Sequence, residues 1–381
     1  MRVLQTTVSN PWEPDHGGGQ LSVHDLSAAL ARGGHDVAVG FTAGPRARPP
    51  AELPYRTWFL PRRERLYLIP VAFYLRLRRI RGEIDVVHVH GFEGAFARAA
   101  VGPSVPIVAT THHPDLPPLQ PVLRGSVLRR AAALHRLIVP FLERLALSGA
   151  DSVAAISAYS AAHLRASGYL RCTSDVRVIH PGVRLVGNAG ARPGVDLVCV
   201  GRLDRQKGFD VLLEAAARAR DVITGIDILG SGPELDKLLA QRTRLKLEDI
   251  VRFRGYVASD QVASYLRGAR ALVMPSRSEN FPRVVLEALA AGLPIVAARV
   301  GGTAEAVRDG VEALLVPPAD VAGLESALRR LAVEPGLRNR LSENAILRAG
   351  AFTWEKTARD TAALYGHVAE TRALRYRARP A

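Results

Sequence analysis

Cysteine is scarce in this chain of 381 residues, and long apolar runs are absent. The two cysteines, Cys172 and Cys199, lie in different halves, so the sequence predicts neither a disulfide framework nor a zinc site. The longest near-continuous apolar stretch, residues 66–75, is broken by Pro70 and is too short to span a membrane. The first residues run directly into polar Gln5, unlike a secretory signal. We therefore expect a cytoplasmic protein, with enough chain for two globular cores.

Lysine is also rare, since 4 Lys accompany 47 Arg and the formal net charge is +15. The densest basic cluster extends from Arg62 to Arg81 and is interleaved with aromatic residues. One interpretation is a peripheral surface that rests on the inner face of an anionic membrane and helps to reach a lipid-linked acceptor. The other is a solvated helix face that reflects a GC-rich coding sequence. No zinc finger, RNP sequence or clear helix-turn-helix is present, so no nucleic-acid partner is expected.

Short β-branched runs alternate with longer helix-compatible segments along the whole chain. Continuous apolar strands between helices are typical of parallel sheets covered on both faces. Six such strands in each half predict an α/β protein with two Rossmann-like domains. The expected strands are residues 2–4, 37–41, 85–90, 105–110, 153–156 and 176–179, then 196–200, 226–229, 250–253, 271–274, 294–297 and 313–316.

The glycine-rich, aperiodic segment 182–194 is the expected linker between these domains. We predict an N-terminal domain over 1–184, a C-terminal domain over 185–352, and a helix over 353–381 that packs back on the N-terminal domain. Ligands of open parallel sheets bind beyond the carboxyl ends of the strands. Candidate site residues are therefore sought in the loops that follow strands.

Two glutamates, Glu279 and Glu287, stand eight positions apart around an expected helix start. Pro282 suits a first helical turn, and Ser278 or Asn280 can cap it. The free N–H groups of that turn and the helix dipole favour a phosphate. One carboxylate can then face a sugar while the other accepts hydrogen bonds from the ribose hydroxyls. The alternative is an amphipathic helix with two solvated glutamates.

Two cations, Arg202 and Lys207, follow the first expected strand of the second domain in the sequence V-G-R-L-D-R-Q-K-G-F-D. Arginine as a planar fork and lysine as a mobile point charge can converge on a diphosphate. Gly201 permits a tight turn, and Gly208 allows a close helix entry. The alternative is a strand–helix turn with two solvated cations.

In the first domain, candidate residues follow the first, third and fourth expected strands. The glycines of H-G-G-G, which end in Gly18 and Gly19, let the backbone approach a phosphate or sugar. His90 ends the third strand, and T-T-H-H-P-D over 110–115 ends the fourth. The residues alone leave open whether these histidines contact a ligand or cap strand ends.

Together these motifs resemble glycosyltransferase family 4, whose members are retaining enzymes of the GT-B fold. The family pattern G-R-L-x-x-x-K-G matches residues 201–208, and the two-glutamate pattern matches the stretch from Glu279. The resemblance extends from Met1 to about Tyr365. It implies two domains whose parallel sheets face each other across a deep cleft. It also implies transfer of a sugar from a nucleotide-diphosphate sugar, with UDP or GDP as the nucleotide, to a hydroxyl acceptor.

The resemblance implies roles for individual residues. Arg202 and Lys207 would neutralise the leaving diphosphate. Glu279 would bind sugar hydroxyls, and Glu287 the ribose. His113, which fits the family's T-x-H-x-D arrangement better than its neighbour, would lie at the reacting face. The implied acceptor contacts are His90, His112 and Asp115. The other implied donor contacts are Gly18, Gly19, Gly230, Tyr256, Val257, Asn280, Phe281, Arg283 and Val284.

Two departures from the family pattern bear on specificity. The usual E-G-F-G reads E-N-F-P here, and Pro282 has no N–H, so phosphate donors must come from its neighbours. The linker entry that begins at Ile179 also departs from the usual P-N-G-V-D. No D-x-D motif occurs, and the two cations with the helix terminus can replace a metal. We therefore expect metal-independent chemistry without a cofactor.

These observations favour a retaining hexosyltransferase, of the kind used in polysaccharide biosynthesis, with a front-face mechanism. The acceptor can be a saccharide, a lipid-linked saccharide or a small metabolite. A sugar-nucleotide epimerase of the same fold is the rival enzyme, but it needs several carboxylates near C2 that the sequence does not place. A catalytically degenerate nucleotide-sugar-binding protein is the non-enzymatic alternative.

Overall fold

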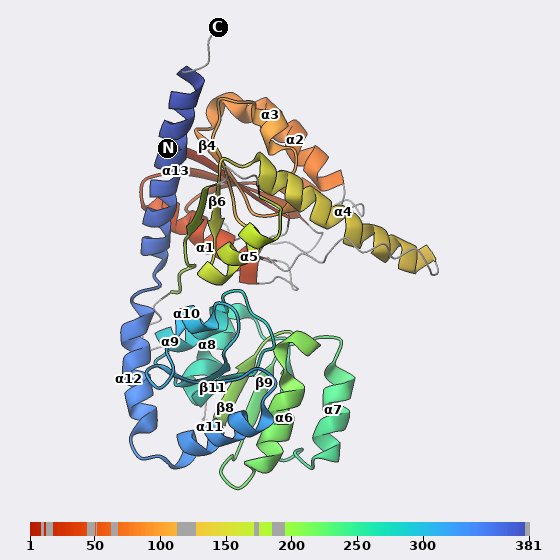
Figure 1. Cartoon of the computed structure of the whole chain (residues 1–381), viewed down its shortest axis with the longest axis vertical. Helices are drawn as coiled ribbons and strands as arrows, with labels where there is room; N and C mark the ends of the chain where they lie inside the picture. Colours follow the sequence, from red (N-terminus) through yellow and green to blue (C-terminus); the bar gives the residue numbers. More distant parts are fainter. Residues whose placement is uncertain are drawn as a thin grey trace. The chain divides into compact units, whose positions relative to one another are not determined.

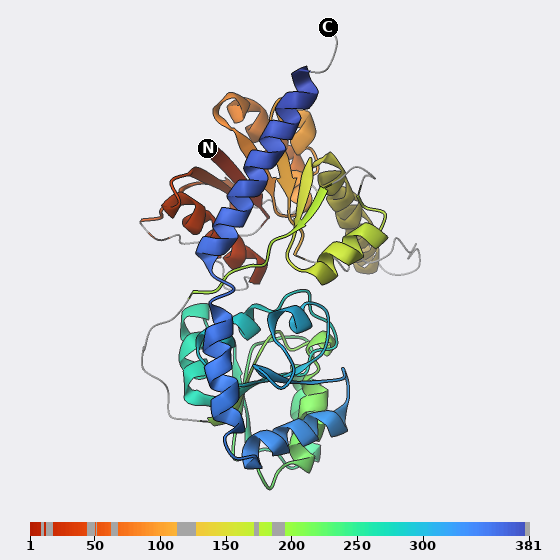
Figure 2. The ribbon, with the colours of Figure 1, turned by 60° about the vertical axis from the view of Figure 1, so that its left-hand side comes forward.

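The computed structural model describes residues 1–8, 11–12, 18–43, 50, 52–61, 68–112, 127–170, 175–184 and 195–377. They form two units, each built on its own parallel sheet (Figures 1 and 2). Unit 1 comprises Met1–Gly182 with Trp354–Ala381, and unit 2 comprises Val183–Thr353. The chain therefore passes between units after Gly182 and after Thr353, next to the boundaries expected at 184 and 352.

The sheet of unit 1 has seven strands in the order β3-β2-β1-β4-β5-β6-β7. All neighbouring strands are parallel, as the apolar runs predict. The strands are β1 (Arg2–Thr7), β2 (Asp36–Ala43), β3 (Arg56–Pro61), β4 (Val86–Val89), β5 (Ile107–Ala109), β6 (Ser152–Ala155) and β7 (Asp175–Val178).

The prediction of six strands in the first half is wrong, because it omits the edge strand β3. Its sequence R-T-W-F-L-P lacks a β-branched run and ends in proline, which an edge strand tolerates. Trp58 of β3 pairs with Gly40 of β2. A Cβ at Gly40 would lie 2.3 Å from the Trp58 ring, so only the absence of a side chain at position 40 leaves room for the indole against the sheet.

Helices cover both faces of this sheet. One face carries α1 (Gly18–Arg32) and α13 (Trp354–Arg377), which share a core with β1 and β2. The other face carries α2 (Ile69–Ile80), α3 (Ala97–Val101), α4 (Val127–Gly149) and α5 (Ala158–Ala166). Short 3-10 turns span Arg81–Glu83 and Phe92–Gly94. None of the helices, over the part of the chain that the structure describes, is long and apolar enough to cross a membrane.

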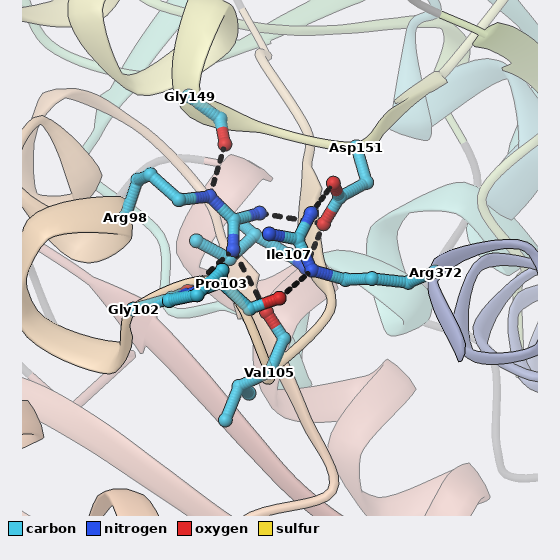
Figure 3. A network of polar contacts seen from close by, with 8 residues as sticks. All are labelled: Arg98, Gly102, Pro103, Val105, Ile107, Gly149, Asp151 and Arg372. Carbon is cyan, nitrogen blue, oxygen red and sulfur yellow. Dashed lines mark hydrogen bonds and ion pairs between the residues drawn. The ribbon is translucent and has the colours of Figure 1, made fainter. Parts of the chain in front are cut away.

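The C-terminal helix α13 is bound to unit 1 by its apolar face and by an ionic network. Tyr365 is fully buried in the core. Near the C-terminal end of the helix, Arg372 donates to Asp151 and to the carbonyl of Pro103 (Figure 3). Asp151 Oδ2 also accepts from Arg98 Nη2 at 2.6 Å and from the Ile107 N–H at 2.8 Å. One carboxylate thus joins α13, α3 and β5.

Replacing Asp151 by asparagine is expected to lower the free energy of unfolding by about 2–4 kcal/mol, because it leaves the half-buried guanidinium groups of Arg98 and Arg372 without a carboxylate. Thermal unfolding followed by circular dichroism measures the effect. The matched control is Asp85→Asn, which breaks the exposed pair with Arg2 and should cost much less stability. Equal losses in the two variants would contradict the assignment of α13 docking to Asp151.

Unit 2 contains a parallel sheet of six strands in the order β10-β9-β8-β11-β12-β13, matching the six strands predicted for this half. The strands are β8 (Val195–Val200), β9 (Ile226–Leu229), β10 (Val251–Gly255), β11 (Ala269–Met274), β12 (Ile295–Ala298) and β13 (Ala313–Val316). The helices are α6 (Phe209–Arg218), α7 (Leu235–Arg244), α8 (Ser259–Gly268), α9 (Arg283–Ala290), α10 (Thr303–Ala306), α11 (Val321–Val333) and α12 (Leu337–Ala349). A 3-10 turn spans Arg205–Lys207.

Each sheet reverses its strand order once. The reversal falls between β1 and β4 in unit 1 and between β8 and β11 in unit 2. Loops leave such neighbouring strands in opposite directions and open a crevice at their carboxyl ends, which is where open α/β sheets bind ligands. The loops after these four strands are therefore the first places to look for a site.

Candidate functional site

In unit 2, the loops after β8 and β11 bring Lys207 and Glu279 together. Lys207 Nζ lies 2.6 Å from Glu279 Oε1. Ser276 Oγ donates to the same oxygen at 2.7 Å. The Glu279 side chain is 9% exposed and that of Lys207 25%, so the pair is shielded but reachable from solvent. The structure thus joins one residue from each of the two motifs that the sequence singled out in this half.

The fold of the loop after β8 fixes the position of the Lys207 backbone. Asp204 caps the 3-10 turn by accepting from the Lys207 N–H at 3.2 Å. Gly208 follows with φ of 67°, and a Cβ there would lie 2.1 Å from the Pro275 carbonyl. Only glycine fits this close approach between the β8 and β11 loops. It is the close helix entry that the sequence predicts at this position.

Three contacts that the sequence analysis did not anticipate hold these two loops against each other. Gln206 Nε2 donates to the Ser278 carbonyl at 3.0 Å, and the Arg277 N–H donates to the Gln206 carbonyl at 2.7 Å. Arg277 also forms a two-pronged ion pair with Asp210 at 2.7 Å, and this hydrogen bonding lowers the pKa of the Asp210 carboxyl. We call the ion pair of Arg277 with Asp210 the clamp. In the sequence, only the position of these two residues beside the two motifs could have suggested it.

The start of α9 differs from the prediction. The N-cap is Pro282, so the expectation that Ser278 or Asn280 caps this helix is wrong. The backbone turns into the helix through the fixed φ of proline, here −75°, and needs no side-chain cap to do so. Asn280 instead accepts from the Gly302 N–H through its backbone carbonyl at 3.0 Å. The first helical residues are Arg283 and Val284. Their backbone N–H groups belong to the first turn, where a helix offers them no carbonyl partner.

The remaining residues expected around α9 comprise a half-buried ion pair and a buried ring. Glu287 lies 3.7 Å from Arg283 one turn earlier, with 28% of its side chain exposed. The Phe281 ring is buried against Phe352 at a centroid distance of 5.7 Å, so any ligand contact of Phe281 would involve its backbone. Arg202 is 72% exposed, and its Nε lies 3.8 Å from the Asp204 carboxylate.

Glycines bring the loops after β8, β9 and β10 into contact. Gly230 has φ of 142°, and a Cβ there would lie 1.9 Å from the Gly201 carbonyl. Its N–H donates to the Gly255 carbonyl at 2.8 Å. Tyr256 follows directly and is 49% exposed, and Val257 is half-buried. The expected residues at 230, 256 and 257 therefore belong to one cluster of loops at the carboxyl edge of this sheet.

In unit 1, strand β4 and the loops after β4 and β5 bring histidines together. The rings of His88 and His90 lie 4.1 Å apart, and those of His90 and His112 stack at 5.7 Å. All three line a pocket whose open space, including the solvent at its mouth, is about 370 Å³. Gly18 and Gly19 lie in the first turn of α1, not in a loop as expected. A Cβ at Gly19 would lie 3.2 Å from the His112 ring.

His113 and Asp115 lie outside the described residues. Of the two adjacent histidines that the sequence analysis considered, His112 is therefore the one whose place is known: beside the glycines of α1 and the His90 ring. Within the described parts of the chain, no three His, Cys, Asp or Glu side chains form a group that could hold a metal ion.

Burial keeps His88 and His90 neutral, and hydrogen bonds orient their rings. His88 Nδ1 lies 2.7 Å from the Tyr365 hydroxyl, and His88 Nε2 lies 2.9 Å from Thr110 Oγ1. Burial lowers the pKa of His88 to about 3 and that of His90 well below its usual range. His90 Nε2 lies 3.1 Å from Gln5 Oε1, an acceptor, so its proton belongs on Nε2.

Glu93, in the loop after β4, is a buried carboxyl with two donors on one oxygen. Glu93 Oε1 accepts from Thr6 Oγ1 at 3.1 Å and from the His90 N–H at 2.9 Å. Burial raises the pKa of Glu93 to about 7, against the opposing effect of these hydrogen bonds. The group therefore carries a proton in the folded protein at pH values where the unfolded chain has lost it.

Replacing Glu93 by glutamine is expected to flatten the dependence of stability on pH. Because the folded pKa is above the unfolded one, the Glu93 contribution is complete below about pH 4.5 and is lost as pH rises through 7, amounting to roughly 3 kcal/mol. Glutamine keeps the accepting oxygen and has no charge to bury. The free energy of unfolding, measured in urea at pH 5 and pH 8, should fall less in the variant. An identical fall in both proteins would refute the assignment.

Comparisons with known proteins agree on the family. Residues 16–186 match the family model described as Glycosyltransferase Family 4, and residues 193–348 match Glycosyl transferases group 1. A D-inositol 3-phosphate glycosyltransferase of Kribbella flavida is 35% identical over 332 residues, which cover 78% of this chain and 75% of that protein. The enzyme of the same description from Streptomyces bingchenggensis is 38% identical over 218 residues, and the match spans only 48% of its length.

A solved structure shows the same fold. Anabaena HepE in complex with UDP-glucose superposes with a TM-score of 0.71 at 21% identity, covering 97% of this chain and 99% of that one. The chain thus has the GT-B fold, with two Rossmann-like parallel-sheet units. It belongs to the group 1 glycosyltransferases, and the family inferred from its motifs is confirmed.

Proposed function

We propose that this protein is a retaining glycosyltransferase that takes its sugar from a nucleotide-diphosphate sugar and needs no metal ion. The observation that carries this proposal is the Lys207–Glu279 pair at the strand-order reversal of unit 2, beside the first turn of α9. A related fold has been solved with UDP-glucose, which supports a donor of this class. UDP or GDP is the expected leaving group.

Lys207 is proposed to stabilise the leaving diphosphate. An ammonium group has three N–H donors, and Glu279 accepts one of them. The other two are available to phosphate oxygens, on which negative charge grows as the bond to the sugar breaks. Arg202, in the same loop and largely exposed, can swing toward the same charge. The N–H groups of Arg283 and Val284 would add the helix terminus.

Glu279 is proposed to serve two purposes. Its Oε1 holds Lys207 and Ser276, which fixes the ammonium group in a shielded place. Its Oε2 would then accept hydrogen bonds from hydroxyls of the donor sugar. Glu287, at the surface of α9 with Arg283, is proposed to accept from the ribose hydroxyls. Gly230, Tyr256 and Val257 would line the nucleotide in the adjoining loops.

The proposed reaction balances without an enzymatic base. The acceptor hydroxyl oxygen bonds to C1 on the face that the diphosphate leaves, and the C1–O bond to the β-phosphate breaks. The hydroxyl proton passes to the leaving phosphate oxygen, and the configuration at C1 is retained. His90 and His112, whose rings stack, are proposed as acceptor contacts, and the neutral His90 ring can accept or donate hydrogen bonds to a polyol. His113 and Asp115 are proposed to join them at the reacting face.

The acceptor is proposed to be a hydroxyl-bearing small molecule, a saccharide or a lipid-linked saccharide. Two relatives are described as D-inositol 3-phosphate glycosyltransferases, which makes a cyclitol phosphate the first acceptor to test. A glycogen synthase of Mycobacterium tuberculosis, 28% identical over 404 residues, makes a glucan the second.

The test is nucleotide release from UDP-, GDP-, ADP- and dTDP-sugars, first alone and then with each acceptor. We expect slow release from one donor, faster release with an acceptor, and loss of both in Arg202→Ala and Glu287→Ala. Lys237→Ala, which removes an exposed lysine of the same unit, is the control. Sugar epimerisation without an acceptor would replace this proposal by the epimerase, and binding without any turnover by the degenerate binding protein.

A further inference from the structure

We propose that the outer face of α2 docks on an anionic lipid surface. Three apolar side chains, Leu68, Val71 and Leu75, are exposed there by 41%, 42% and 54%. They stand at i, i+3 and i+7, so they form one stripe along the helix. The opposite face, with Phe73 and Leu77, is buried in the core of unit 1. The exposed stripe is therefore a second apolar face, which the described part of the fold leaves open to solvent.

Basic residues flank this stripe. Arg78 and Arg79 lie three and four positions after Leu75, hence one turn further on the same side, and both are exposed. Arg76 is exposed beside the stripe, with its guanidinium 5.7 Å from the Trp58 ring centroid. Arg81 follows at the helix end. From residue 68 to residue 82 the sequence has four Arg and no Asp or Glu.

The combination of apolar and basic side chains on one exposed helix face indicates which kind of surface binds there. A bilayer interface accepts the apolar stripe at the level of the acyl chains, while arginines reach up to anionic headgroups on flexible stems. The sequence just before the helix, from Arg62 to Arg65, carries three more arginines and one glutamate, so the charge continues past the described helix. α2 lies beside α3 on the sheet face away from α1 and α13 (Figure 1). The structure thus favours the membrane interpretation of this cluster over a merely solvated face.

The role is independent of the donor chemistry, because α2 belongs to unit 1 and the Lys207–Glu279 pair to unit 2. It would bring the enzyme to a membrane surface where a lipid-linked acceptor lies, but vesicle binding needs neither donor nor acceptor. Failure of this inference would therefore leave the proposed function untouched. Nucleotide release, measured on the same protein, tests the proposed function separately from membrane docking.

The experiment is co-sedimentation of the full chain with vesicles of phosphatidylcholine alone and of phosphatidylcholine mixed with phosphatidylglycerol. We expect binding to the mixed vesicles only, weakened by salt. Val71→Glu/Leu75→Glu should abolish it. Arg78→Gln/Arg79→Gln, which leaves the apolar stripe intact, should weaken it roughly tenfold or more. The thermal midpoint and nucleotide release should not change in either double variant.

The matched control is Ile346→Glu/Leu347→Glu, which removes two apolar side chains of α12 in unit 2 that are 59% and 77% exposed. Its vesicle binding should equal that of the unaltered protein. Absence of binding to the mixed vesicles, equal binding to both vesicle types, or undiminished binding of both α2 variants would overturn the inference. A dimer in solution that the Glu variant alone dissociates would instead assign this face to a second copy of the chain.

Discussion

Alanine at position 207 is expected to lower kcat for sugar transfer by roughly 10²–10³-fold, since it removes a preorganised cation from the place where leaving-group charge develops. The reason lies in the geometry of Lys207: its ammonium group is held 2.6 Å from Glu279 and is only 25% exposed. A cation in such a shielded place acts on a phosphate more strongly than one in bulk water. The variant also leaves the Glu279 carboxylate without its cation, which opposes the approach of a diphosphate.

Two controls separate this effect from a loss of folding or of surface charge. Lys237→Ala removes a lysine that is 75% exposed in its pair with Glu234, and it should leave kcat unchanged. The thermal midpoint of each variant reports on the fold. Steady-state transfer that is equal in Lys207→Ala and Lys237→Ala would show that the leaving group is stabilised elsewhere.

Replacing Glu279 by glutamine should lower kcat by roughly 10²-fold but should not weaken binding of the free nucleoside diphosphate. The amide keeps the shape of the side chain and an oxygen for the Ser276 hydroxyl, which donates at 2.7 Å. What it loses is the negative charge that orients Lys207 and receives the sugar hydroxyls. Removing a carboxylate near the diphosphate also removes a repulsion, so nucleotide affinity should stay the same or rise.

The comparison of kcat with nucleotide affinity makes this prediction specific. A purely structural role for Glu279 would lower both together through a poorly formed loop. Glu234→Gln, which alters the ion pair with the exposed Lys237, is the control and should change neither quantity. A Glu279→Gln enzyme with full turnover would remove this carboxylate from the proposed mechanism.

The fold was largely predictable because its periodic signals are strong. Buried strands such as β12 and β13 read as continuous apolar runs, and both sheets are parallel as those runs require. The edge strand β3 was missed, since an edge strand needs only one buried side and its pairing depends on the space that Gly40 leaves for Trp58. Such a contact between distant positions has no local pattern.

The site was predictable in its residue types and less so in its contacts. The motif residues Lys207 and Glu279 could be named from spacing, but their direct ion pair follows from the approach of two loops at Gly208. The helix cap was predicted from side-chain preferences, whereas the backbone of Pro282 makes the turn. The clamp of Arg277 on Asp210 joins residues 67 positions apart and could not be inferred from either motif alone.

Calorimetric titration of the nucleoside diphosphate released from the preferred donor tests the central claim most directly, with EDTA present throughout. The account predicts that the unaltered protein and Lys237→Ala bind equally, that Lys207→Ala binds at least about tenfold more weakly, and that Glu279→Gln binds no more weakly than the unaltered protein. Equal affinities for the unaltered protein and Lys207→Ala, or binding that requires a divalent metal, would contradict it.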